Sequence, residues 1–198
     1  MSYRKYYSSN GFDFVLYQDL SLEDSVSVLS CRNHINVRKW MFNSEEITKE
    51  NHFIFVENLK NNNEKKYCVV YRKKKLIACV YYDTIAEGKY FAGHFLNPKL
   101  LSSGIGLYFE YVYLKFFFEY LKAKMIKATV KKENSAMIKI HRLCDFKESL
   151  NQDSIYYNYE FTDKQYKNIP DNINKFVTQL IHKFKINEYT RKSNKNNS

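Results

Sequence analysis

The stretch that decides the fold is YFAGHFLNPKLLSSGIG, residues 90–106, with the segments that follow it as far as Phe146. Residues 90–96 form an apolar strand that stops at an Asn-Pro pair, and the loop 101–106 then opens a helical run that continues through Tyr120. A helix N-terminus presents unpaired backbone N–H groups at the positive end of the helix dipole, and glycines let an anion approach them closely. This arrangement predicts a loop that binds a pyrophosphate.

A strand over residues 124–130 and an Asn-led helix over 134–146 complete the pattern. In this order the segments resemble the GNAT superfamily of N-acetyltransferases. Gly104 and Gly106 match that family's pyrophosphate loop, while Leu101 stands where the family has Gln or Arg. Asn134 begins a segment similar to the family's second motif, in which His141 replaces the usual Tyr and Asp145 the usual Gly.

A second, narrower resemblance lies upstream, in Arg32-Asn33-His34 and the segment 37–43, followed by Ile47, His52, Phe55 and Leu59. These residues resemble the nucleotide-sugar N-acetyltransferases of pseudaminic acid biosynthesis, the PseH type, which serve flagellin glycosylation. The match spans roughly residues 14–159. It implies an acetyl-CoA-dependent enzyme that acetylates the 4-amino group of a UDP-4-amino-4,6-dideoxy-N-acetylhexosamine (UDP-4-amino-4,6-dideoxy-N-acetyl-beta-L-altrosamine) by direct attack in a ternary complex.

The family geometry implies where acetyl-CoA would bind. The backbone of the strand at Phe95 and Leu96 would pair with the pantetheine arm, and Asn134 would hydrogen-bond that arm. The pyrophosphate would lie on the loop residues Leu101, Ser102, Ser103, Gly104, Ile105 and Gly106.

By position in the second motif, the resemblance gives His141 the role of the acid that protonates the departing CoA thiolate. Imidazolium is a competent acid near neutral pH, with an unperturbed pKa of ~6.5. The alternative is an ordinary helix residue, with the proton coming from water or another side chain. No residue stands out as a general base, and His34, His94 and His182 are expected to be structural or surface residues.

The acceptor residues also follow from the resemblance. Arg32 suits a nucleotide diphosphate, because a guanidinium makes charged hydrogen bonds to phosphate; the alternative is a helix-terminal salt bridge. Met41, Phe42 and Phe55 would form an apolar wall for the methyl group of a 6-deoxy sugar, and are otherwise core residues. The acceptor-binding residues expected are Arg32, Met41, Phe42, His52, Phe55, Asp83, Thr84 and Phe95.

Composition further limits the class of protein and its partners. The 198 residues fit one domain, and 32 basic against 21 acidic residues give a net charge of +11, which suits an anionic partner such as CoA or a UDP-sugar. The four cysteines show no metal-ligand spacing, and no metal is expected. No run approaches the ~18 apolar residues of a membrane span, and no signal peptide is recognised, so we expect a cytoplasmic protein.

The expected fold is α/β, the GNAT fold, with a mixed, mostly antiparallel central sheet flanked by helices in a single domain. The acetyltransferase domain is expected over 12–162. A C-terminal extension, 163–198, holds an amphipathic helix over about 171–186 and then a disordered basic tail. The elements expected are strands at 12–17, 67–71, 76–83, 90–96, 124–130 and 155–161, and helices at 21–31, 47–60, 105–120 and 134–146.

Three alternatives remain open. A GNAT enzyme could acetylate a protein N-terminus or a polyamine, although a charge of +11 would repel a polyamine. The chain could also be a catalytically silent acetyl-CoA-binding protein, or bind nucleic acid through its basic surface. The favoured interpretation has no nucleic-acid partner, and similar enzymes are often homodimers.

Overall fold

The structure is a computed structural model that describes residues 4–101, 103–149 and 153–169. Ser102, the helix expected over 171–186 and the basic tail lie outside the described residues.

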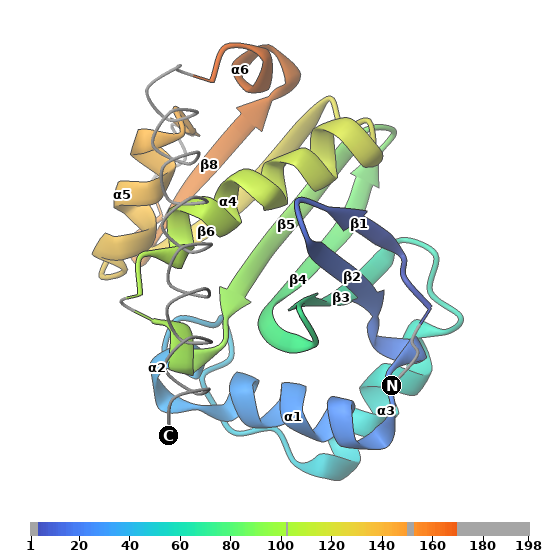
Figure 1. Ribbon diagram of the computed structural model, residues 1–198. Helices are drawn as coiled ribbons and strands as arrows, with labels where there is room; N and C mark the ends of the chain where they lie inside the picture. The colour runs from blue at the N-terminus through green and yellow to red at the C-terminus, as the bar shows by residue number, and fades with distance from the viewer. Residues whose placement is uncertain (1–3, 102, 150–152, 170–198) are drawn as a thin grey trace, which may run out of the picture.

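The described strands form one eight-stranded sheet in the order β1-β2-β3-β4-β5-β6-β8-β7 (Figure 1). Every neighbouring pair is antiparallel except β5 and β6, which run parallel. The mixed, mostly antiparallel sheet expected from the sequence is therefore confirmed. The strands are β1 Tyr7–Ser9, β2 Phe12–Leu16, β3 Lys65–Arg72, β4 Lys75–Ala86, β5 Lys89–Leu96, β6 Met125–Lys131, β7 Lys147–Glu148 and β8 Tyr156–Thr162.

Two of the helices begin at polar N-cap residues whose side chains accept backbone hydrogen bonds. Ser21 accepts a hydrogen bond from the Asp24 N–H at 3.1 Å, and Asn134 accepts one from the Met137 N–H at 3.2 Å, so both satisfy N–H groups that the helix leaves unpaired. The helices are α1 Leu22–Asn33, α2 Ile35–Arg38, α3 Lys49–Leu59, α4 Ile105–Lys115, which continues as a π-helical turn at Phe116–Tyr120, α5 Ser135–Leu143 and α6 Asp163–Lys167.

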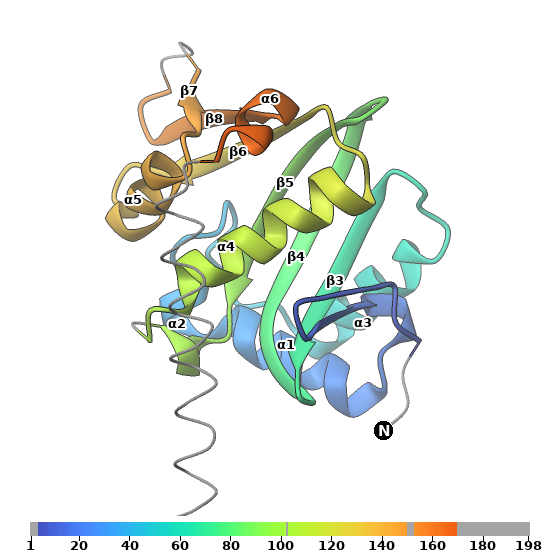
Figure 2. The same ribbon diagram turned by 45° about the horizontal axis from the view of Figure 1, so that its top comes forward.

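The sheet is covered on both faces, and α4 lies across one of them (Figures 1 and 2). Strand alternation sends neighbouring residues of β3 to opposite faces: Cys68 and Val70 pack into the core under α4, and Val69 and Tyr71 pack under α1 and α3. The core under α4 is the larger, and aromatic rings dominate it. This double burial explains why the central strands are nearly continuous apolar runs.

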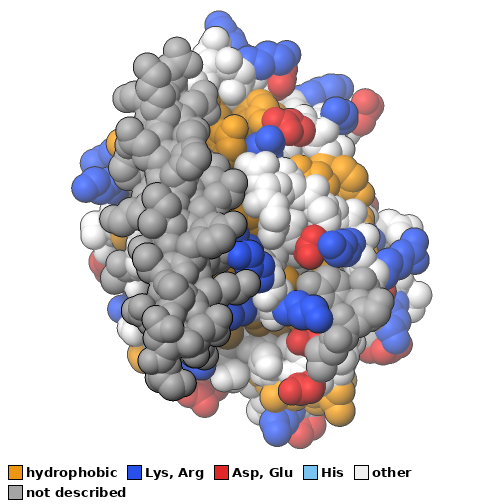
Figure 3. Space-filling model, in the orientation of Figure 1, with side chains coloured by type: hydrophobic (Ala, Val, Ile, Leu, Met, Phe, Trp, Pro, Cys, Tyr) orange, Lys and Arg blue, Asp and Glu red, His pale blue; other side chains and the backbone are white. Residues whose placement is uncertain are grey.

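Basic side chains are scattered on the face of the molecule that Figure 3 shows. Figure 3 shows lysine and arginine side chains spread over the visible face, with acidic side chains among them. This mixture is typical of a solvated surface, and it does not form the single basic stripe that nucleic-acid binding would favour.

The sheet opens between β5 and β6. The two strands pair only where Lys89–Phe91 faces Met125–Lys127, and then they separate, while β5 stays paired with β4 and β6 with β8 (Figure 1). In the part of the chain that the structure describes, the facing edges of residues 92–96 and 128–131 therefore have no strand partner. Main-chain groups on these edges are free for a ligand.

The elements that the sequence did not predict are short. β1, α2, β7 and α6 have two to five residues each, too few for a period to show in the sequence. Because β1 pairs with β2 and α6 follows β8 directly, the folded unit extends beyond the expected limits of 12 and 162 at both ends.

Candidate active site

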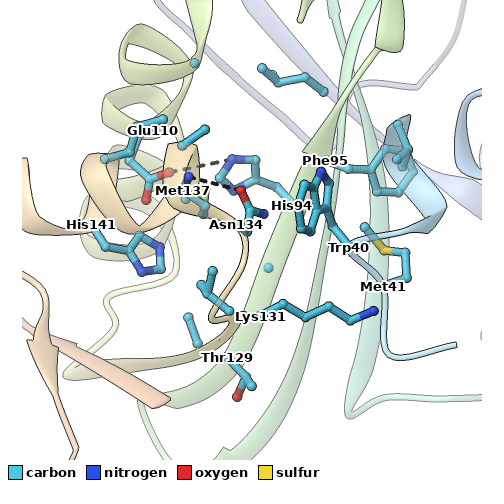
Figure 4. Close-up of a pocket in the computed structure, with 18 of the residues that line it drawn as sticks. Trp40, Met41, His94, Phe95, Glu110, Thr129, Lys131, Asn134, Met137 and His141 are labelled. Atoms are coloured by element: carbon cyan, nitrogen blue, oxygen red, sulfur yellow. Dashed lines mark hydrogen bonds and ion pairs between the residues drawn. The ribbon is translucent and has the colours of Figure 1, made fainter. Parts of the chain in front are cut away.

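A cavity of about 440 Å³ lies in the opening between β5 and β6. Its walls come from both strands, from α4 and α5 and from the segment that follows α2, as Figure 4 shows. The residues expected to contact acetyl-CoA that line it are Phe95, Leu96, Leu101, Gly106 and Asn134.

The start of α4 has the shape that an anion needs. Gly104 caps the helix with φ +80°, a left-handed conformation that glycine adopts without strain. A Cβ at Gly106 would lie 3.3 Å from Cδ1 of Ile140, so glycine lets α4 approach α5 closely. Ser103 donates its hydroxyl to the Leu100 carbonyl at 2.6 Å, which ties the loop to the turn before it.

The far side of the cavity is basic and aromatic. Trp40 and Met41 follow α2 and form part of the wall, and Lys39 places its ammonium 4.9 Å from the Trp40 ring centre. Lys131, at the end of β6, donates to the Lys39 carbonyl at 2.8 Å and so links the strand to this segment across the opening. Lys39 and Lys131 give this side a positive charge.

His141 lines the cavity but is 3 % exposed. Its ring stacks on Phe146 with centres 4.1 Å apart and meets Tyr159 edge-on, and its Nδ1 has no hydrogen-bond partner among the described residues. Burial, and next the charge of His94, lower the pKa of His141 to about 3. The expected imidazolium acid at neutral pH therefore does not fit this residue, because burial keeps the ring neutral.

Among the cavity residues that the sequence did not predict are a buried carboxylic acid and a buried imidazole. Glu110 on α4 and His94 on β5 both line it, with Glu110 Oε2 3.6 Å from His94 Nε2 (Figure 4). That separation would suit an ion pair, but burial disfavours both charged forms: it raises the pKa of Glu110 to about 8 and lowers that of His94 to about 4. The expectation that His94 is only structural is not supported, since its ring faces the cavity.

The expected acceptor residue His52 has a different place. It is 5 % exposed on α3 and shares a 3.0 Å hydrogen bond with Ser25 of α1, so it joins two helices. Burial lowers its pKa. The position is that of a satisfied core histidine, and the prediction that it contacts the acceptor is corrected on that ground.

The three residues of the expected apolar wall are not brought together. Met41 lines the cavity. Phe55 packs on Tyr67 with ring centres 4.9 Å apart, beneath the sheet, and Phe42 is 59 % exposed beside Tyr156. Of the three residues predicted to form the wall, Met41 lines the cavity and Phe42 and Phe55 do not.

Arg32, Asp83 and Thr84 lie outside the set of residues that line the cavity. Arg32 donates to the Asn43 carbonyl at 2.6 Å, in place of the salt bridge weighed above, and its Nη1 is buried without a hydrogen-bond partner among the described residues. Asp83 approaches Lys65 at 3.4 Å, and its Oδ1 is likewise buried and without a hydrogen-bond partner there. The Thr84 N–H donates to the Glu64 carbonyl at 2.8 Å.

Residues 4–101, 103–149 and 153–169 hold no group of three His, Cys, Asp or Glu side chains placed to bind a metal ion. Within the same ranges, no helix has the length and apolar character that crossing a bilayer requires.

No family model matches the chain. Two curated relatives, each named Acetyltransferase PseH and from two strains of Campylobacter jejuni subsp. jejuni, are 25% and 26% identical to it over 126 residues, which is 64% of this chain and 78% of each relative. The crystal structure of the Campylobacter jejuni N-acetyltransferase PseH superposes with a TM-score of 0.64 at 21% identity, covering 77% of this chain and 99% of that one.

The chain is similar to the PseH N-acetyltransferases and has the GNAT fold. The fold and the resemblance expected from the sequence are confirmed. A spermidine N-acetyltransferase from Vibrio cholerae, solved in complex with CoA and spermine, shares the same fold, with a TM-score of 0.67 at 17% identity over 81% of this chain and all of that one (100%). A structure of the Campylobacter PseH was solved in complex with acetyl coenzyme A.

Proposed function

We propose that this enzyme transfers the acetyl group of acetyl-CoA to the 4-amino group of a UDP-4-amino-4,6-dideoxy-N-acetylhexosamine in pseudaminic acid biosynthesis. The observation that carries the proposal is the cavity in the open sheet, with a glycine-capped helix N-terminus on one side and Lys39 and Lys131 on the other. Both ends therefore suit an anion, as CoA and a nucleotide sugar require.

Acetyl-CoA would enter from the side of α4. Its pyrophosphate suits the N–H groups at residues 104–106, because they begin a helix and glycine permits close approach. The free edge of β5 at Phe95 and Leu96 offers backbone groups to the pantetheine amides and to the thioester carbonyl. Asn134, already the cap of α5, lines the same cavity and supports a contact with that arm.

The acceptor would occupy the side bounded by Trp40, Met41 and Lys131. Arg32 and Asp83 are proposed as contacts for the nucleotide beyond the cavity, since each has a buried polar atom without a hydrogen-bond partner among the described residues. The 4-amino group, held near the thioester in its neutral form, attacks directly in a ternary complex. Proximity supplies much of the rate.

A polyamine acceptor is the second candidate, because the spermidine acetyltransferase shares the fold. A polycation needs carboxylates. The acidic residue that lines the cavity is Glu110, which burial keeps protonated, and the lysines would repel the ligand. The charge of the cavity therefore favours the nucleotide sugar.

The test is thiol release from acetyl-CoA with the UDP-amino-sugar, spermidine or an N-terminal peptide as acceptor. Rapid release with the nucleotide sugar alone is expected. Release with spermidine or the peptide alone would contradict the proposed acceptor. No release with any of the three would indicate a binding protein without acetyltransferase activity.

Lys131→Gln examines the acceptor charge. We expect KM for the nucleotide sugar to rise about tenfold, as the loss of one charged hydrogen bond predicts, with KM for acetyl-CoA unchanged. Lys127→Gln is the matched control, because Lys127 lies on the same strand but pairs with Glu160 at 3.0 Å, away from the cavity. Equal effects of the two changes would contradict the assignment.

A further inference from the structure

Glu110 is an unusual residue for the middle of an apolar helix. It lies one turn after Gly106 on α4, its side chain is 0 % exposed, and neither carboxyl oxygen has a hydrogen-bond partner among the described residues. Figure 4 shows the carboxyl group directed toward His94, on the same wall of the cavity as His141. A buried carboxyl group in this state costs stability that a leucine of similar volume would not. Such a cost is typical of a functional residue.

The surroundings of Glu110 determine its charge. The titratable groups that face it are His94 on β5, Tyr113 on its own helix, His141 on α5 and Cys144 just after α5. Burial keeps both imidazoles neutral and raises the pKa of the Tyr113 hydroxyl and the Cys144 thiol, so none of these four groups is charged at neutral pH. The carboxyl group consequently stays protonated.

The reaction needs an acid that holds a proton at neutral pH and has a pKa near that of the leaving thiol. A thiol has an unperturbed pKa of ~8.5. Burial raises the pKa of Glu110 to about 8, whereas that of His141 is about 3, so Glu110 is the better match. Tyr113, with its pKa raised well above the ordinary value, is a poor donor.

We propose that Glu110 is the acid that protonates the CoA thiolate and that His94 returns the amine proton to it. This inference rests on the proposed acetyl transfer. The amine nitrogen forms the bond to the thioester carbon, the carbon–sulfur bond breaks with its electron pair on sulfur, and the Glu110 hydroxyl gives its proton to that sulfur. The proton that nitrogen releases passes through His94 to the Glu110 carboxylate. One proton leaves nitrogen and one reaches sulfur, so both residues end unchanged.

Glu110→Gln is the decisive substitution, because glutamine keeps the shape and neutrality of the protonated side chain but cannot serve as the acid. We expect the single-turnover rate of acetyl transfer to fall about 100-fold, within the usual range for one acid, with the Kd of acetyl-CoA unchanged. In the wild type this rate should decline as pH rises through about 8, and the variant should lack that decline. A wild-type rate in the Glu110→Gln variant would overturn the proposal.

Glu119→Gln is the matched control. Glu119 lies on the π-helical turn after α4, pairs with Lys115 at 3.5 Å and does not line the cavity, so the rate should not change. His94→Gln should slow transfer by a similar factor to Glu110→Gln, and the double variant should be little slower than either single one, because the two residues act as a unit.

Infrared spectroscopy separates this proposal from the proposed function. Wild type at pH 7 should show the carbonyl stretch of a buried protonated carboxyl group, lost at higher pH and absent from Glu110→Gln. The measurement needs no acceptor, so it remains decisive if no acceptor releases CoA or if the variant fails to fold. Absence of the band in wild type at pH 7 would overturn the role of Glu110 even where acetyl transfer is confirmed.

Discussion

Two seams between paired strands of the sheet, separated by the β4–β5 pair, differ in almost every respect. Between β3 and β4 the strands pair along their whole shared length, from Lys65 opposite Asp83 to Arg72 opposite Lys75, with apolar residues buried on both faces. Between β5 and β6 the pairing stops after Phe91 and Lys127. The second seam holds the cavity, with Glu110 and His141 buried and incompletely hydrogen-bonded along it.

The difference shows how the fold divides stability from function. Unpaired backbone edges and buried polar groups without partners are both unfavourable, since each has lost its hydrogen bonds to water. Both occur between β5 and β6, where the proposed ligands would supply the missing partners. The closed seam should therefore respond to mutation mainly through stability, and the open seam mainly through catalysis.

The largest expected effect is a loss of stability in the aromatic core away from the cavity. Phe116 is 0 % exposed and stacks on Phe14 of β2 with ring centres 4.7 Å apart. Phe116→Ala should lower the free energy of unfolding by about 3–5 kcal/mol, because it removes a buried ring and leaves a cavity. Urea unfolding measures this. The exposed Phe42→Ala should change stability by no more than about 0.5 kcal/mol, and a small loss for Phe116→Ala would contradict the division.

His141→Phe tests how a buried histidine at the open seam makes the stability of the protein depend on pH. The folded pKa of about 3 lies below the unfolded value of 6.5, so the unfolded state binds more protons and acid destabilises the protein. Between pH 6.5 and 5 this residue should cost about 2 kcal/mol, at about 1.4 kcal/mol per pH unit. The variant keeps the stack on Phe146 and should lose that much less stability over the same range, measured by urea unfolding at each pH. Identical pH dependence would show that His141 protonates freely in the fold.

The same variant ranks the two candidate acids. If His141 only shapes the cavity, the single-turnover rate of His141→Phe should fall far less than that of Glu110→Gln. The reverse order would restore His141 as the acid.

The sequence predicted what depends on local chemistry. The loop glycine that begins α4 and the asparagine that begins α5 are each determined within a few residues, and the structure has Gly104 and Asn134 at those helix starts. The order of the main strands and helices along the chain, including α4 and α5, followed from the same local signals together with the resemblance to GNAT enzymes. Leu101 and Gly106 line the cavity, although the glutamine or arginine usual in the family is missing from position 101; their contact with the pyrophosphate stays a prediction.

The acid–base residues could not be predicted in the same way, because they depend on which face of an element meets which neighbour. His52 resembled a ligand by position, yet its helix turns it toward Ser25. The sequence predicts His94 to be structural, because a single histidine in a strand does not indicate which face of the sheet its side chain lies on. The signal that could have identified Glu110 was present: it is the one charged residue between Gly106 and Leu114, and it lies one turn from that glycine.

Ser25→Ala examines the histidine outside the open seam. It removes the 3.0 Å hydrogen bond to His52 and should lower the free energy of unfolding by about 1 kcal/mol. KM for the nucleotide sugar should not change, because this pair joins α1 to α3 and does not line the cavity. A rise in that KM would return His52 to the acceptor site.

The smallest expected difference comes from two glycines with nearly the same backbone. Gly104, at the start of α4, has φ +80° and Gly11, in the β1–β2 turn, has φ +78°, and a Cβ on either would meet nothing within 4 Å. Alanine at each should therefore cost the same strain, about 1 kcal/mol, and the two variants should unfold at the same urea concentration. Only Gly104→Ala should weaken acetyl-CoA binding in calorimetry, because only that residue lies where the pyrophosphate is proposed to bind. Equal affinities in the two variants would contradict binding of the pyrophosphate at the helix N-terminus, but would not affect the description of the fold and its open seam.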